Sequence, residues 1–365
     1  MKALPSLGGS RVFGLDLMRA LSLILIMCVH ASPLFVAHSM AGARSLIPIG
    51  VIAVEIFFVL SGFLIGQILL KLADDRLTLK GFLLRRWFRT LPNYFLFLIL
   101  NFLVYAFVLQ VQVGDWRYFV FAQNLFAPMQ VAFFPESWTL AAEEWFYFLT
   151  PMLLVVARAL LGPGRRAFFA VAIFALLLYP AMRIAAVVLG DPHWDEGIRK
   201  VVYLRLDTMM YGVALAGVKH YLPHVWQRLG GNLAIVGAAL LLGWLAAYAL
   251  IDIEKAEWLA VLTFSVVPAG CAAFLPYLDR WQRASVPFWD RWITNLSLWS
   301  YSMYLLHFLL MMVVLKFGFE FASQSLLNAF GIVLVWAFVV GYLGGKVYRY
   351  FELPCTNLRD RFTSS

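Results

Sequence analysis

The stretch PIGVIAVEIFFVLSGFLIGQILLKL, residues 48–72, decides the fold class of this chain. Its ionisable side chains are Glu55 and Lys71, and Lys71 lies at its end. An α-helix of about 20 apolar residues, rising 1.5 Å per residue, crosses the hydrocarbon core of a bilayer. The stretch is longer and more apolar than most helices of soluble proteins, so it predicts a membrane-spanning helix.

The composition extends this prediction to the whole chain. Of 365 residues, 63% are hydrophobic and only 13% are charged, and the mean hydropathy is +0.82. Soluble domains carry about 25% charged residues. The net charge of +9 lies in short loops between apolar stretches rather than on one basic face, so we expect no nucleic-acid partner.

Further apolar stretches of the same kind follow along the chain, and none resembles a repeat or a linker. About ten spans are predicted, at 14–36, 48–72, 91–111, 138–161, 167–189, 201–218, 232–251, 258–278, 293–315 and 326–345. Residues 118–134 are apolar but contain Gln123, Asn124 and Pro128, which predicts a re-entrant or interfacial element. The expected fold is all-α, with one membrane domain over residues 1–365.

The positive charges predict the orientation of the spans. With the N-terminus in the cytoplasm, most of the 29 Lys and Arg residues fall on the cytoplasmic side. Because this arrangement also puts the C-terminal charges inside, it favours an even number of spans with both termini cytoplasmic.

Several ionisable side chains fall within or beside the predicted spans. An Arg or Asp at the centre of a membrane helix costs about 2.5–3.5 kcal/mol on insertion scales, and such residues usually face a cavity. We therefore predict one polar cavity inside the bundle. The residues in question are Arg19, His30, Glu55, Glu143, Glu144, Arg205, Asp207 and His307.

Arg19 and His30 are eleven residues apart, about three helical turns, so they share one helix face roughly 16 Å apart. In the predicted orientation Arg19 lies nearer the cytoplasm and His30 nearer the outside. Glu143 and Glu144 are about 100° apart around a helix, so only one of them can fully face the cavity.

Seven motifs in this order resemble the acyltransferase-3 family of membrane O-acyltransferases. GLDLMRALSLILIMCVH (residues 14–30) is similar to its first-helix signature, in which an Arg precedes a His. The others are VEIFFVLSGFLI (54–65), RRWFRTLP (85–92), SWTLAAEEWFYFLTP (137–151), YLRLDTMMYG (203–212), SYSMYLLH (300–307) and RYFELP (349–354). Glu55 and Thr139 stand where Asp and Ser are more usual.

The resemblance implies transfer of an acyl group, most simply acetyl, from cytoplasmic acyl-CoA to a sugar hydroxyl of an extracytoplasmic or lipid-linked glycan. His30 is then the general base, and Glu143 orients it or protonates the leaving thiolate. Arg19, Arg86 and Arg89 are expected to bind the donor phosphates. An esterase-like domain that some relatives carry after the last helices is not expected here.

Five further residues are predicted to line the cavity or contact the acceptor; the alternative is structural ion pairing or, for His307, a hydrogen-bonding position in the core. They are Asp16, Glu55, Arg205, Asp207 and His307. Structural alternatives also exist for the main residues: His30 as a histidine that forms a hydrogen bond between helices, Arg86 and Arg89 as positive-inside anchors, Arg19 paired with Asp16, and Glu143 paired with Arg205.

The rival interpretation is a transporter or flippase that uses the buried charges to move a polar substrate, and a third is a relative that only binds lipid-linked sugar. Cys28, Cys271 and Cys355 lack metal or disulfide spacing, and no permanently bound cofactor or metal is expected. The expected partners are acyl-CoA, a glycan acceptor and membrane lipid, and the expected location is a bacterial plasma membrane.

Overall fold

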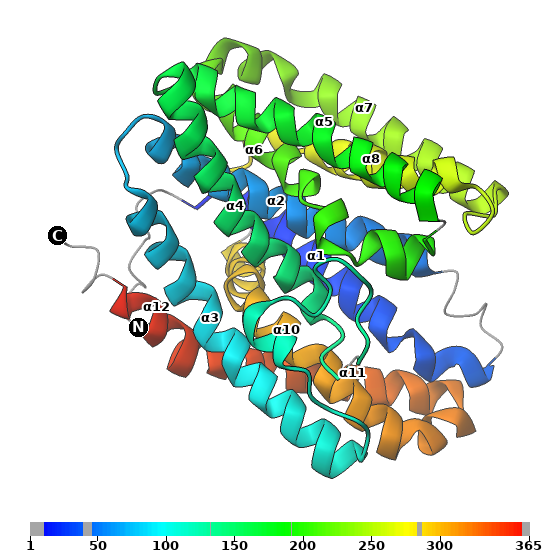
Figure 1. Ribbon diagram of the computed structural model, residues 1–365. Helices are drawn as coiled ribbons and strands as arrows, with labels where there is room; N and C mark the ends of the chain where they lie inside the picture. The colour runs from blue at the N-terminus through cyan, green and yellow to red at the C-terminus, as the bar shows by residue number, and fades with distance from the viewer. Residues whose placement is uncertain (1–10, 39–45, 132, 191, 283–286, 360–365) are drawn as a thin grey trace.

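The computed structural model describes residues 11–38, 46–131, 133–190, 192–282 and 287–359, and within these ranges all regular structure is helical. Nine helices of the described part are long and apolar enough to cross a membrane. The chain is therefore an all-α, multi-pass membrane protein (Figure 1). The two ends of the predicted domain, residues 1–10 and 360–365, lie outside the described residues.

The long helices include short 3-10 or π turns at several ends. The first half of the chain contains α1 (Phe13–Ala31), η1 (Ser32–His38), α2 (Ile47–Ala73), α3 (Leu79–Leu103), η3 (Val104–Leu109), η4 (Trp116–Val120), α4 (Ser137–Leu161) and α5 (Arg165–Gly190). The second half contains η5 (Trp194–Arg199), η6 (Val202–Leu204), α6 (Asp207–Tyr221), α7 (Pro223–Leu250), α8 (Glu257–Ala272), α9 (Leu275–Leu278), α10 (Pro287–Gln324), α11 (Leu326–Val347), η7 (Tyr348–Glu352) and α12 (Leu353–Leu358).

Two predicted spans differ from the observed helices. Residues 201–218 were predicted as one span, but there the chain forms η6 and then α6, a helix of only 15 residues. The span predicted at 91–111 begins earlier, at Leu79, because the Thr78 side chain caps the helix by accepting a hydrogen bond from the Gly81 backbone N–H at 3.1 Å. Consequently Arg86 and Arg89 lie inside α3, three residues apart.

Helix α2 lies at the centre of the bundle, in contact with α1, α3, α4, α5, α6 and α8 (Figure 1). Its closest neighbour is α6, because both helices carry glycine where they cross. A Cβ atom on Gly62 would collide with the Met209 carbonyl, and one on Gly212 would collide with the Val59 carbonyl. Small residues allow such backbone approach in membrane bundles.

The 118–134 segment, of which residue 132 is not described, is a largely irregular element that supports the start of α4. Asn124 donates from Nδ2 to the carbonyls of Lys200 at 2.6 Å and Trp138 at 3.2 Å. Gln123 donates from Nε2 to Ser137 Oγ at 3.2 Å. The segment therefore does not cross the membrane as a helix. Its two amide side chains are buried and hydrogen-bonded to neighbouring segments, which explains why these polar residues occur in an otherwise apolar stretch.

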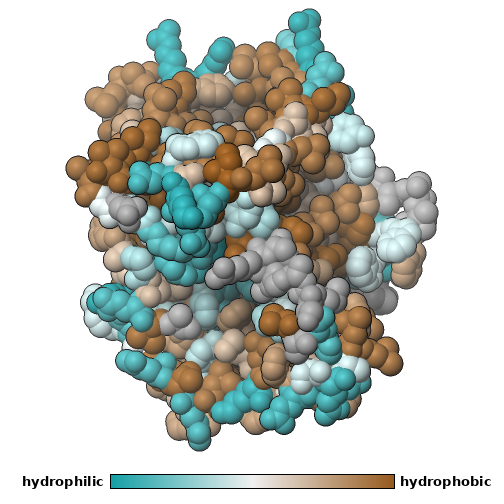
Figure 2. Space-filling model, turned by 90° about the vertical axis from the view of Figure 1, so that its right-hand side faces the viewer, coloured by the Kyte–Doolittle hydropathy of each residue, from teal (hydrophilic) through white to brown (hydrophobic). Residues whose placement is uncertain are grey.

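The outer surface is that of a protein surrounded by lipid. Leu160, Leu177, Leu334 and Phe338 are each about 70% exposed or more. Figure 2 shows broad hydrophobic areas on one side of the molecule, with hydrophilic side chains gathered in separate patches. Exposed apolar area of this extent is stable only against an apolar environment.

Candidate functional site

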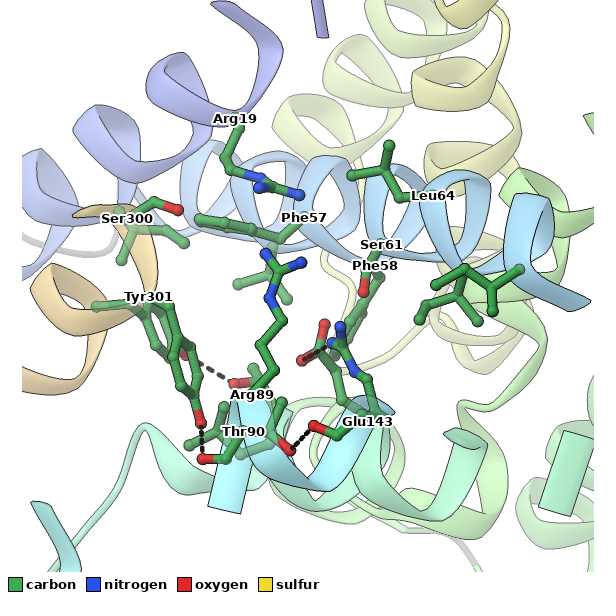
Figure 3. A pocket seen from close by; sticks show the side chains of 18 residues that line it. Arg19, Phe57, Phe58, Ser61, Leu64, Arg89, Thr90, Glu143, Ser300 and Tyr301 are labelled. Atoms are coloured by element: carbon green, nitrogen blue, oxygen red, sulfur yellow. Dashed lines mark hydrogen bonds and ion pairs between the residues drawn. The ribbon is translucent and has the colours of Figure 1, made fainter. Parts of the chain in front are cut away.

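A cavity opens between α1, α2, α3, α4 and α10, and five separate helices contribute to its lining (Figure 3). Four residues predicted from the sequence line it: Arg19, Arg86, Arg89 and Glu143. Apolar side chains of α2, such as Phe57 and Leu64, form one wall. The cavity thus combines cationic groups with an apolar channel wall.

Arg19 and Arg89 point into the same space from α1 and α3 (Figure 3). Within the described part of the chain, neither side chain makes a hydrogen bond or an ion pair. Two guanidinium groups of like charge in a largely apolar bundle are unfavourable without a counter-ion. The arrangement is therefore suited to a ligand that carries negative charge, and the planar fork of arginine favours phosphate.

Arg86 differs from the other two arginines because protein groups hold it. Its guanidinium hydrogen-bonds Tyr147 Oη and lies 3.8 Å from Glu143 Oε2. Tyr147 Oη is also 2.6 Å from Ser61 Oγ on α2. Glu143 therefore lies against Arg86, and Glu144 lies on the other side of α3 and α4 in a separate groove beside Trp87 and Trp145.

Glu143 does not contact His30, as the first of its two predicted roles, orienting that histidine, would need. His30 Nδ1 lies 2.8 Å from His307 Nε2 on α10, whereas the carboxylate of Glu143 faces Arg86. Glu143 lies toward the end of the second turn of α4, about one turn beyond Thr139, and its carboxylate is 3.8 Å from Arg86. The alternative pairing of Glu143 with Arg205 is also wrong, since Arg205 binds Glu55.

The histidine pair adjoins the cavity at the Tyr304 end. Tyr304 lines the cavity, its hydroxyl lies 2.8 Å from Thr139 Oγ1, and its ring centroid lies 5.3 Å from that of His307. Ile26, one turn before His30 on α1, also lines the cavity. The common face of α1 predicted from the spacing of Arg19 and His30 therefore runs along the cavity and reaches the histidines.

Three of the predicted cavity residues belong to a buried charge network outside the cavity lining. Asp207 accepts two hydrogen bonds from Arg183 on α5, at 2.7 and 2.8 Å, and Glu55 on α2 pairs with Arg205. All four side chains are essentially inaccessible. The network joins α2, α5 and α6, so the structural reading applies to Glu55, Arg205 and Asp207.

Asp16 also has a structural place rather than one in the cavity lining. Its carboxylate accepts from Arg11 Nε at 3.0 Å and from Ser297 Oγ at 2.6 Å. These bonds tie the first turn of α1 to α10. The predicted partner Arg19 makes no such bond with it in the described residues and instead faces the cavity.

Tyr304, Tyr147 and Glu136 belong to the site region but are not among the residues predicted from the sequence. The first two stand within quoted motifs at helical spacing from assigned residues, Tyr304 three before His307 and Tyr147 four after Glu143, and this spacing is the signal that could have found them. Glu136 is a buried carboxyl whose two oxygens lack hydrogen-bond partners, and burial raises its pKa to about 8. Among the described residues, no group of three or more His, Cys, Asp or Glu could hold a metal ion.

A family model described as an acyltransferase domain matches residues 12–345 of this chain. The chain belongs to the acyltransferase-3 family. The match covers all the long helices from α1 through nearly the whole of α11, so the site described above lies entirely inside the family domain.

Individual relatives share only a quarter to a third of their aligned residues with this chain. "Acyltransferase MdmB" of Streptomyces mycarofaciens is 25% identical over 98% of this chain and 93% of its own length. A "Putative O-acetyltransferase" of Staphylococcus aureus (strain COL) is 29% identical over 56% of this chain, and the "Putative peptidoglycan O-acetyltransferase YrhL" of Bacillus subtilis (strain 168) is 31% identical over 60%.

The matches to the last two relatives span only 34% of each relative's length. No solved structure matches the chain. What these relatives have in common with this chain is therefore the membrane acyltransferase domain.

Proposed function

We propose that this protein is a membrane O-acyltransferase that moves an acyl group, most simply acetyl, from cytoplasmic acyl-CoA to a hydroxyl of an extracytoplasmic or lipid-linked sugar. The observation that carries the proposal is the cavity in which Arg19 and Arg89 meet, neither of them in an ion pair or a hydrogen bond with an acidic side chain of the described residues. Coenzyme A supplies the missing negative charge through its phosphates, and its pantetheine arm suits the apolar wall of α2. The family membership supports acyl transfer as the reaction.

The reaction needs a base at the far end of the cavity. In the proposal, His30 accepts the proton of the acceptor hydroxyl as its oxygen attacks the thioester carbonyl. The carbon–sulfur bond then breaks, and the coenzyme A thiolate takes the proton from the imidazolium. The proton of the acceptor hydroxyl thus ends on the thiol of coenzyme A, and no further reactant is needed.

The separation of the two ends of the site fits this assignment. Arg19 and His30 lie roughly 16 Å apart along α1, from the helical rise. A long donor that is anchored by its phosphates at the arginines can therefore present its thioester near the histidines. Glu143 lies 3.8 Å from Arg86, and we assign it the role of holding that arginine toward the donor.

The acceptor is assigned by class. A sugar hydroxyl on the outer side suits the named relatives, one of which is named for peptidoglycan O-acetylation, and the bacterial sources of the relatives favour a bacterial plasma membrane. Mass spectrometry of surface glycans from cells that express the wild type or His30→Ala identifies the acceptor. Loss of acetylated species in the variant supports the proposal.

The donor site is tested with purified protein and two donors, acetyl-CoA and acetyl-pantetheine, which lacks the nucleotide and pyrophosphate. Arg19→Ala and Arg89→Ala should each raise KM for acetyl-CoA about tenfold or more, because a hydrogen bond to a charged group contributes about 1.5–3 kcal/mol. The KM for acetyl-pantetheine should change little, since that donor has no phosphates to bind.

Arg85→Ala is the matched control, because Arg85 lies on the same helix but is exposed. It should leave both KM values unchanged. If the cavity variants also leave KM for acetyl-CoA unchanged, the arginines are only membrane anchors and the donor site is wrong. Movement of a substrate into vesicles that contain no thioester would instead favour a transporter.

A further inference from the structure

The buried contacts of His307 fix the protonation of its neighbour. His307 Nδ1 lies 2.5 Å from the backbone carbonyl oxygen of Tyr304, three residues earlier on α10. A carbonyl oxygen can only accept a hydrogen bond, so Nδ1 of His307 must carry a hydrogen. This bond lies within one helix.

The second nitrogen of His307 is then determined. A neutral imidazole has a single N–H, so Nε2 of His307 presents a lone pair. A charged His307 is unfavourable at this position, because the side chain is fully buried beside Tyr304 and Phe308, and the described residues place no carboxylate in contact with it. His307 is accordingly neutral and accepts a hydrogen bond at Nε2.

The tautomer of His30 follows from that bond. Nδ1 of His30 lies 2.8 Å from His307 Nε2 and must donate its hydrogen to it. The remaining nitrogen of His30, Nε2, therefore presents the lone pair. Within the described part of the chain, this nitrogen makes no hydrogen bond, and His30 is half-buried whereas His307 is sealed.

We infer that His307 is a positioning residue that selects the Nδ1–H tautomer of His30 and so leaves Nε2 of His30 as the base for the acceptor hydroxyl. The inference rests on the proposed function and assigns the two histidines unequal roles. His307 cannot be the base itself, since both its nitrogens are engaged. Its role resembles that of the third group in a nucleophile–base–orienter triad, with a neutral imidazole in place of a carboxylate.

The two histidines also change together during the reaction. When His30 Nε2 takes the acceptor proton, His30 becomes an imidazolium, and its Nδ1–H bond to His307 becomes charge-assisted and stronger. The bond thereby stabilises the charged state that exists only after proton transfer. The proton then leaves from Nε2 to the thiolate, and His307 keeps its own hydrogen throughout.

Neighbouring helices hold the pair in place. The Trp336 indole N–H on α11 donates to the His307 carbonyl at 3.1 Å. Phe308 packs its edge against the His30 ring, with centroids 4.9 Å apart. The ring centroids of His30 and His307 lie 5.0 Å apart, and the two ring planes are inclined by only 27°. The contact between α1 and α10 therefore presents His30 in one orientation.

The test is a graded series at position 307 in purified full-length protein. His307→Gln places an amide oxygen near the original Nε2, so it should keep kcat within about tenfold of the wild type. His307→Asn is too short to reach, and His307→Phe fills the ring volume without an acceptor. Both should lose about a hundredfold or more in kcat, the usual scale for a disabled general base, and should leave KM for acetyl-CoA nearly unchanged.

The outcome separates the inference from a simple packing role. If only volume matters, His307→Phe retains activity and His307→Gln does not, and the inference is overturned. Equal inactivity of His307→Gln and His307→Phe, with unchanged thermal unfolding, would also overturn it. The surface variant His224→Gln is the control for histidine loss and should behave as the wild type. If His30→Ala still transfers acetyl groups, the proposed base itself is wrong.

A second measurement does not depend on any variant's activity. Imidazole ¹⁵N chemical shifts in histidine-labelled protein distinguish the two tautomers, with the His30 signals assigned by their loss in His30→Gln. The expected result is a protonated Nδ1 and an unprotonated Nε2 on His30 in the wild type. Observation of the opposite tautomer, which is the commoner one for free histidine, would refute the inference.

Discussion

The arginine side chains inside this bundle differ in whether they form an ion pair with a carboxylate. Arg183 is fully buried and donates hydrogen bonds to both carboxylate oxygens of Asp207. Arg205 is equally buried and forms an ion pair with Glu55. Arg19 and Arg89 reach a cavity and form no ion pair with an acid in the described residues. Because a buried charge needs compensation, the first two have a structural explanation, and the last two are suited to an anionic ligand.

Glu136 predicts a pH dependence of stability. Burial raises its pKa to about 8, from an ordinary value of 4.5, so the folded state holds the proton more tightly than the unfolded state. This contribution is fully present below about pH 4.5 and is lost as the pH rises through about 8. Wild-type protein in detergent should therefore unfold at a temperature several degrees lower at pH 9 than at pH 6.

Glu136→Gln removes the titrating group at nearly constant volume. Its unfolding temperature should vary less between pH 6 and pH 9 than that of the wild type, and should exceed it at pH 9. Thermal unfolding followed by intrinsic fluorescence measures both. Parallel pH profiles for the two proteins would contradict the assignment.

At the scale of elements, α2 serves a different neighbour on each face. Ser61, Phe57 and Leu64 face the cavity, Glu55 joins the buried charge network, and Gly62 lies against α6. The same helix therefore couples the cavity wall to the packing of α6. Its motif residues serve two purposes, packing and cavity lining, at positions one residue apart.

The glycine contact between α2 and α6 gives an element-scale prediction. In Gly62→Ala the new methyl group would collide with the Met209 carbonyl, so the helices must separate. Overpacking of this kind costs about 1–3 kcal/mol, and the unfolding temperature should fall. Gly341→Ala in α11 is the control, because a Cβ there meets nothing within 4 Å and should not lower it. Equal stability of both variants would show that the crossing is adaptable.

At the scale of the whole molecule, the connections after α2, α4 and α6 lie close together, and the predicted orientation puts all three on the cytoplasmic side. The Gly164 N–H after α4 donates to the Ala73 carbonyl at the end of α2, and Tyr221 at the end of α6 donates to Asp74. Three inter-helix connections therefore gather at one end of the bundle. Arg76 and the basic residues at the adjoining helix ends favour the cytoplasm for that end: Lys71, Lys80, Arg158, Arg165, Arg166 and Lys219.

Cysteine labelling tests this orientation. In a variant with the three native cysteines replaced, Glu254→Cys after α7 should react with a membrane-impermeant maleimide in intact cells. Pro163→Cys between α4 and α5 should react only after permeabilisation. Both positions are exposed, so access to the reagent depends on the side of the membrane. The reverse labelling pattern would invert the protein and put the arginines on the wrong side for cytoplasmic acyl-CoA.

The sequence by itself determined the all-α membrane fold, most of the spans and the face that Arg19 shares with His30. Hydropathy and the 3.6-residue period are local properties, so they can be read without knowing any neighbour. The partners of these side chains emerge only from the packed helices: His307 rather than Glu143 for His30, Glu55 for Arg205, and no ion pair for Arg19 and Arg89 among the described residues. Partners depend on which helices cross and how each is rotated, and these are set by contacts between distant residues, such as Gly62 with Met209.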